Sequence, residues 1–130
     1  MCIRDRQYTS PAGTNIFFTH MDANGEILIN KIYSEPGFES GRDIIQRADG
    51  SFVIIGNSDP NSNGESNMYL LFIDENGNKI SAKIFGNNYA GFGEAIIETE
   101  DGGLGLFGTT TDMDEVGEFY LLKTDADGNL

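Results

Sequence analysis

Short runs of alternating apolar and polar residues follow one another along this chain, and their order returns after 52 residues. Residues 68–109 can be placed over residues 16–57 without a gap. The matched pairs are mainly aspartates, glycines and isoleucines: Asp22/Asp74, Asn24/Asn76, Gly25/Gly77, Lys31/Lys83, Ile32/Ile84, Gly41/Gly93, Ile44/Ile96, Ile45/Ile97, Asp49/Asp101, Gly50/Gly102 and Gly56/Gly108. Part of the pattern begins a third time at an offset of 51, where Tyr120, Asp125 and Gly128 repeat Tyr69, Asp74 and Gly77. A fixed period of this size indicates an array of similar structural units.

Each unit contains four runs that the pattern predicts to be β-strands. The first run is apolar on both alternating faces, which is typical of a strand between packed sheets. The second alternates apolar residues with lysine, as an outer strand does, and the fourth is the most apolar and should be buried. No stretch shows a sustained helical period. The predicted strands are residues 15–21, 26–33, 41–48 and 51–57, then 67–73, 78–85, 93–100 and 103–109, and finally 118–124.

The predicted strands are separated by turn motifs. An Asp-x-(Asn/Asp)-Gly motif follows the first strand of each unit at residues 22–25, 74–77 and 125–128. Its aspartate can accept backbone hydrogen bonds and its glycine tolerates a positive φ, so the motif predicts a tight hairpin turn. Asp-Gly at residues 49–50 and 101–102 predicts two more hairpins. The Gly56/Gly108 pair predicts a bend or bulge, and the Val53/Gly105 exchange predicts a close approach of two backbones.

Four strands of about seven residues in a repeat of about 50 are typical of one blade of a β-propeller. The predicted fold class is all-β, with about two and a half four-stranded antiparallel blades in an open fragment. The expected divisions are an artefactual or disordered N-terminus and loop at 1–14, repeats at 15–66 and 67–117, and the first strand and turn of a third repeat at 118–130. Propellers use roughly four to eight blades, so this piece should leave open edges and associate when expressed alone.

Composition removes several classes of partner. The chain has 21 acidic and 8 basic residues and a net charge of −13, which would repel nucleic acid and anionic membranes. No apolar run approaches the roughly 18 residues of a transmembrane helix, so membrane insertion is not expected. The only cysteine, Cys2, cannot form a disulfide within the chain. Residues 1–6 lack the layout of a signal peptide and have no counterpart in the repeat, so they are set aside.

A resemblance covers residues 15–130. The Tyr-Leu-Leu strand, the Asp-x-Asn-Gly turn, Lys-Ile-Phe-Gly, a strand ending at Asp-Gly-Gly and an apolar strand ending in Gly-Thr-Thr resemble a bacterial β-propeller-like repeat. That family is abundant in secreted and surface proteins of the Bacteroidota, often with a C-terminal sorting domain. Where the family usually has Trp after the turn, this chain has Ile29 and Ser81. The resemblance implies an extracellular or cell-surface location.

If each unit is an up-and-down meander, the tight turns share one end and the long loops 34–40, 58–66, 86–92 and 110–117 share the other. Binding usually resides on such loops, and aromatic residues beside carboxylates and amides suit a carbohydrate. The expected ligand is a carbohydrate or a protein, besides the neighbouring blades of a longer chain. The alternative is that these are ordinary solvated loops. The candidate ligand-binding residues are Phe38, Asp59, Asn87, Asn88, Tyr89, Phe92, Asp112 and Asp114.

Catalytic and metal chemistry find little support in these residues. The turn aspartates place Gly at the fourth position, whereas a calcium-binding EF-hand loop needs it at the sixth. The only histidine, His20, corresponds to Phe72 and Lys123 in the other units, so a catalytic base is not expected there. We therefore expect no catalytic residue, metal site or cofactor, and a scaffold or ligand-binding role. The alternative is a propeller hydrolase acting on polysaccharides, with its catalytic residues outside this piece.

Overall fold

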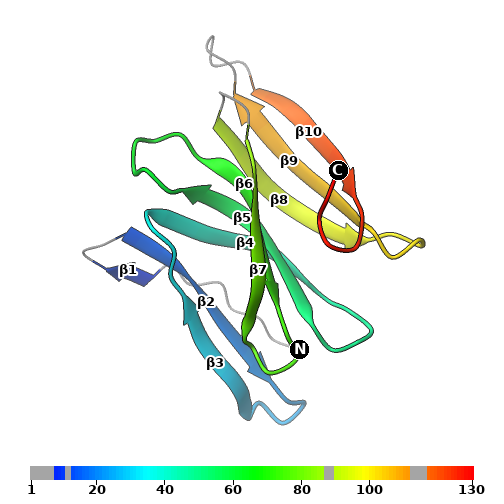
Figure 1. Cartoon of the computed structure of the whole chain (residues 1–130). Helices are drawn as coiled ribbons and strands as arrows, with labels where there is room; N and C mark the ends of the chain where they lie inside the picture. The colour runs from blue at the N-terminus through cyan, green and yellow to red at the C-terminus, as the bar shows by residue number, and fades with distance from the viewer. Residues whose placement is uncertain (1–7, 11–12, 87–89, 112–116) are drawn as a thin grey trace.

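The computed structural model describes residues 8–10, 13–86, 90–111 and 117–130 (Figure 1). This part of the chain contains ten β-strands and no helix, so it holds no helix that could cross a membrane. All paired strands are antiparallel, which confirms the all-β class. The strands are β1 (Tyr8–Ser10), β2 (Gly13–Met21), β3 (Ile27–Tyr33), β4 (Phe38–Gln46), β5 (Phe52–Asp59), β6 (Asn67–Ile73), β7 (Lys79–Phe85), β8 (Ala90–Glu98), β9 (Leu104–Thr111) and β10 (Gly117–Thr124).

Nine of these strands occupy the nine predicted runs. The differences lie at their ends: β4 begins at Phe38 and β8 at Ala90, three residues before the predicted starts at Gly41 and Gly93. The strand β1 was not predicted, because residues 1–14 were expected to be disordered or loop. It pairs with the start of β2, from Tyr8 opposite Asn15 to Ser10 opposite Gly13.

The strands form three sheets, ordered β1-β2-β3, β4-β5-β6-β7 and β10-β9-β8, and none of them is closed in the described part (Figure 1). The central sheet takes its strands from two sequence units, because β5 pairs with β6 across the expected boundary at residue 66. The expected grouping of 15–66 and 67–117 into separate sheets is therefore shifted by two strands. The reason is burial: β5 and β6 are apolar on both faces and take the centre, while the lysine-bearing β7 takes an edge.

The repeat is visible in the irregularities of the strands. The ladder slips between His20 and Met21 in β2, and again between Phe72 and Ile73 in β6. A second slip lies between Gly41 and Asp43 in β4, and between Gly93 and Ala95 in β8. Each pair of slips is 52 residues apart. Gly56 and Gly108 lie opposite the second pair, so the predicted bulge exists but belongs to the partner strand.

One expectation about these strands was wrong. Gly105 was predicted to mark a close approach of two backbones. A methyl group added there would instead meet the side chain of Ile97, at 2.9 Å from its Cγ1. Ile97 lies directly opposite Gly105 in the β8–β9 ladder, so the missing side chain accommodates a cross-strand neighbour rather than a second backbone.

The three sheets pack through two apolar cores, one on each face of the central sheet. The first core joins the β2–β3 pair to the central sheet, and the second joins the central sheet to β8, β9 and β10. Polar contacts between successive sheets also recur: the Lys31 Nζ atom donates to Asn78 Oδ1 at 2.7 Å, and Lys83 makes the same contact with Asn129. These residues are related by offsets of 52 and 51. The same polar contact therefore recurs at both interfaces between the sheets.

The predicted tight turns are confirmed by their hydrogen bonds. In the central turn, Asp74 Oδ1 accepts from the backbone N–H groups of Asn76 at 2.9 Å and Asn78 at 2.7 Å. Gly77 has a φ of 78°, a conformation in which other residues are strained. These backbone hydrogen bonds hold the pKa of Asp74 below its ordinary value. The aspartates are thus occupied as turn residues, and the turns at 22–25 and 125–128 have the same pattern.

Candidate functional site: a pocket at the long-loop end of the central sheet

A pocket of about 270 Å³ lies on the face of the central sheet that meets the first sheet. Residues 35–36, from the connection between β3 and β4, form one wall, and Ser58 and Pro60 at the end of β5 form another. The β6 and β7 strands supply the rest. The lining residues are Glu35, Pro36, Ser58, Pro60, Tyr69, Lys79, Ala82 and Ile84. Two of the predicted long loops therefore border this pocket.

Glu39 is a buried acid beside this pocket. It lies opposite Ser58 in the β4–β5 ladder, so both side chains project from the same face of the sheet. The side chain is 1% exposed, and its carboxylate accepts hydrogen bonds of 3.4 Å from the Glu35 N–H and from Ser58 Oγ. Burial raises the pKa of Glu39 to about 7, because water no longer stabilises its charge. Near neutral pH this carboxyl group can both donate and accept a proton.

Tyr69 contributes a hydroxyl group that has no partner among the described residues. The residue lies opposite Gly56 in the β5–β6 ladder, and its ring belongs to the first core. Burial, with the negative charges of Glu35 and Glu39, raises the pKa of this phenol, so it stays protonated. A buried hydroxyl group without a partner is uncommon in proteins and needs an explanation, such as a water or ligand at that point.

An ion pair between Lys79 and Glu35 completes the polar part of the pocket. Both side chains are about one-third exposed, at 39% and 31%, so the pair lies where the pocket opens to solvent. An exposed pair of this kind contributes roughly 0–1 kcal/mol to stability. This ion pair can exchange its internal contact for a contact to a ligand at little cost. The pocket therefore offers carboxylate, ammonium and phenol groups beside the apolar side chains of Ala82 and Ile84.

The predicted ligand residues have varied positions. Phe38, at the start of β4, is 44% exposed, and its Cα partner in the ladder is Asp59. Asp59 is buried, and its carboxylate accepts from the N–H groups of Asn63 at 3.2 Å and Gly64 at 2.7 Å, so it holds its own loop. Phe92 is half-buried in the third sheet. The others, Asn87, Asn88, Tyr89, Asp112 and Asp114, lie outside the described residues. Ligand binding by all eight stays a prediction.

Sequence reasoning missed Glu35, Tyr69 and Lys79, which line the pocket, and the buried Glu39 beside it. The sequence pattern predicts that the third strand begins at Gly41, which leaves Glu39 in the preceding loop. One signal was available: Glu39 aligns with Gly91 in the second unit, so an acid occurs where the repeat elsewhere has no side chain. The described part of the chain holds no group of three or more His, Cys, Asp or Glu residues arranged to bind a metal ion.

Comparisons with known proteins do not assign this chain to a family. No protein family profile matches the sequence, and no curated protein sequence matches it. Proposals about function therefore depend on the repeated packing of the sheets and on the chemistry of the pocket.

Proposed function

We propose that this chain is part of a β-propeller-like repeat protein of the extracytoplasmic bacterial type. Its role is a non-catalytic scaffold that binds a carbohydrate or protein ligand at the long-loop end of its sheets. The observation that supports the array most directly is the recurrence of the same inter-sheet contacts: Lys31 with Asn78, and Lys83 with Asn129. A contact that repeats with the sequence period is what an array of equivalent units requires.

The outer face of the third sheet supports the same proposal. Phe119 and Leu121 in β10 are 83% and 75% exposed, although their counterparts Met68 and Leu70 are fully buried in the second core. Ile97 and Phe107 are also exposed on the third sheet. The third sheet therefore exposes four large apolar side chains. Their counterparts in the central sheet are covered by the neighbouring sheet, which indicates that another sheet packs on this face of the third sheet.

The pocket beside Glu39 supports ligand binding at the long-loop end. Sugar hydroxyl groups both donate and accept hydrogen bonds, and the pocket offers both possibilities. The Tyr69 hydroxyl group, which has no partner among the described residues, can donate, and the Glu35 carboxylate, which lines the pocket, can accept. The exposed ring of Phe38, at the start of the strand that carries Glu39, adds an apolar surface at the same end of the sheet.

The experiment is a calorimetric titration of the chain with a panel of soluble oligosaccharides. The Tyr69→Phe variant removes one hydroxyl group and keeps the ring. Because one net hydrogen bond contributes roughly 0.5–1.5 kcal/mol, we expect this variant to bind about two- to twelvefold more weakly.

The matched control is Tyr120→Phe, since Tyr120 is the repeat counterpart of Tyr69 in the third sheet and does not line the pocket. Binding should be unchanged in this variant. If no oligosaccharide binds at millimolar concentration, or if the two variants lose equal affinity, carbohydrate binding at this pocket is refuted.

A further inference from the structure

The dipeptide Asn-Gly occurs at equivalent positions of the first two Asp-x-Asn-Gly turns, as Asn24-Gly25 and Asn76-Gly77. Asn-Gly is chemically unstable, because glycine has no side chain to keep its backbone nitrogen away from the side chain of the asparagine. That nitrogen can attack the Cγ atom of the asparagine. A bond forms between these two atoms, the Cγ–Nδ2 bond breaks, and the amide leaves as ammonia with the proton of the glycine nitrogen. Water then opens the cyclic imide, which leaves aspartate or isoaspartate.

The glycine nitrogen is held in the same way in both turns. The Gly25 N–H group donates to the carbonyl oxygen of Asp22 at 3.1 Å, and the Gly77 N–H group donates to that of Asp74 at 3.0 Å. A nitrogen held in this bond is not free to attack the neighbouring side chain, so the turn must open locally first. The rate of the reaction therefore depends on which contacts each turn loses when it opens.

The turn of the central sheet is held by the first sheet. The Tyr33 hydroxyl group donates to the Gly77 carbonyl oxygen at 2.7 Å, and Lys31 Nζ donates to Asn78 Oδ1 at 2.7 Å. Gly77 is buried, and a methyl group added there would be 2.6 Å from Ile29 Cγ2. Opening this turn therefore breaks contacts with a second sheet.

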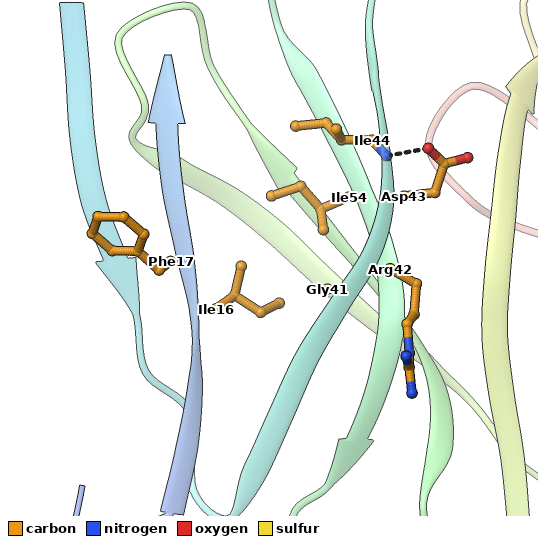
Figure 2. A pocket seen from close by; sticks show the side chains of 7 residues that line it. All are labelled: Ile16, Phe17, Gly41, Arg42, Asp43, Ile44 and Ile54. Carbon is orange, nitrogen blue, oxygen red and sulfur yellow. Dashed lines mark hydrogen bonds between the residues drawn. The ribbon is translucent and has the colours of Figure 1, made fainter. Parts of the chain in front are cut away.

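An apolar core keeps Tyr33 in place. Ile16 lies directly opposite Tyr33 in the β2–β3 ladder. Figure 2 shows Ile16 with Ile44 and Ile54 of the central sheet, around a space of about 280 Å³. Tyr33 belongs to the same core and is 8% exposed. Its hydroxyl group therefore stays on the central turn as long as the two sheets stay packed.

The turn of the first sheet is held only by its own hydrogen bonds among the described residues. Residues 23–28 are exposed, and a methyl group added at Gly25 would meet nothing within 4 Å. The Asn24 side chain makes one long contact, 3.5 Å from its Nδ2 atom to Asp22 Oδ2. This turn can therefore open without disturbing another sheet.

A third Asn-Gly pair, Asn63-Gly64, lies in the loop after β5 and is held by acidic side chains. The Gly64 N–H group donates to the Asp59 carboxylate at 2.7 Å, which is a strong, charge-assisted bond. The Asn63 amide group is held at both ends by Glu65, at 3.1 Å through its oxygen and at 2.9 Å through its nitrogen. Attack on Asn63 therefore also requires the loss of contacts that Asn24 lacks.

We infer that Asn24 is a site of spontaneous deamidation in the folded chain, and that Asn76 and Asn63 are protected by their contacts. Each net hydrogen bond shifts an equilibrium by about two- to twelvefold. The two bonds from the first sheet should therefore slow the reaction at Asn76 by at least about fivefold relative to Asn24. The inference depends on the packing of the described sheets and not on ligand binding.

The test follows the three asparagines by peptide mass spectrometry while the folded 130-residue chain is incubated at mildly alkaline pH. We expect Asn24 to deamidate at least about fivefold faster than Asn76, and faster than Asn63. The same incubation in urea is the control. Because urea removes the turns and the packing of the sheets, the three rates should become similar there.

Two variants test the protection of Asn76. Tyr33→Phe removes the hydroxyl group that holds the central turn, so Asn76 should react about two- to twelvefold faster and Asn24 at its former rate. Tyr69→Phe is the matched control, because Tyr69 lies in the same core and its hydroxyl group has no partner among the described residues. The ratio of the Asn76 and Asn24 rates in one sample corrects for any general loss of stability.

Three results would overturn the inference. In the first, Asn24 reacts as slowly as Asn76 in the folded chain. In the second, the difference between them persists in urea, which would assign it to the neighbouring residues in the sequence. In the third, Tyr33→Phe and Tyr69→Phe change the ratio of the two rates equally.

Discussion

The buried acid Glu39 should make the stability of this chain depend on pH in a direction opposite to that of the turn aspartates. Its pKa is about 7 in the folded chain, against an ordinary value of 4.5. Between these values the folded state binds more protons than the unfolded state, so the free energy of unfolding falls as pH rises. The stabilising contribution is complete below the ordinary pKa and is lost as pH passes through about 7.

The size of the effect follows from the difference between the two pKa values. A shift from 4.5 to about 7 corresponds to at most about 3.5 kcal/mol, since one pKa unit is about 1.4 kcal/mol. Between about pH 5.5 and pH 8.5, linkage predicts a loss of about 2 kcal/mol in the free energy of unfolding. The turn aspartates, whose pKa values are lowered, lose their contribution only as pH falls below about 4, outside this window.

The assay is urea unfolding of the chain and of Glu39→Gln at these two pH values, followed by circular dichroism at low protein concentration. Glutamine keeps the shape of the side chain and does not titrate, so the fall of about 2 kcal/mol should disappear in the variant. Glu94→Gln is the matched control, because Glu94 is exposed on β8, and it should keep the pH dependence of the unaltered chain. An equal fall in the unaltered chain and in Glu39→Gln would refute the account of Glu39 as a buried acid.

Two further predictions concern the turns and the third sheet. Asp74→Ala removes the acceptor of two backbone hydrogen bonds. By analogy with lost capping residues, urea unfolding should show a loss of about 1 kcal/mol in the free energy of unfolding. An unchanged urea midpoint would mean that water replaces the carboxylate. Replacing Phe119 and Leu121 by serine should reduce association of the chain in sedimentation velocity, because these side chains occupy the face where another sheet is proposed to pack. Ile80→Ser is its control, since Ile80 and its counterpart Leu28 are exposed in both units. Equal effects of the two changes would contradict the proposal.

The strands and turns could be predicted because they are set by neighbouring residues. Apolar residues at every second position indicate a strand. An aspartate three residues before a glycine, as at Asp74 and Gly77, indicates a turn. Both signals occur in each unit, so each unit confirms the other. The paired slips near Gly41 and Gly93 show that this equivalence extends to fine backbone geometry.

The grouping of strands into sheets could not be read from the repeat. A period of 52 residues is the same whichever strand begins the unit, so the pattern has no starting point. Pairing of β5 with β6, rather than of β3 with β4, was decided by burial, since the strands that are apolar on both faces must be covered on both sides.

The pocket also depended on the tertiary structure. Glu39 and Tyr69 are 30 residues apart in the sequence and come together only because β4, β5 and β6 are neighbours in one sheet. The raised pKa of Glu39 arises from burial, which no local pattern records. By itself, then, the sequence determined an all-β array of strands and tight turns, because those depend on adjacent residues. Only the tertiary structure decided which strands share a sheet and which acid is buried, because those depend on contacts between distant residues.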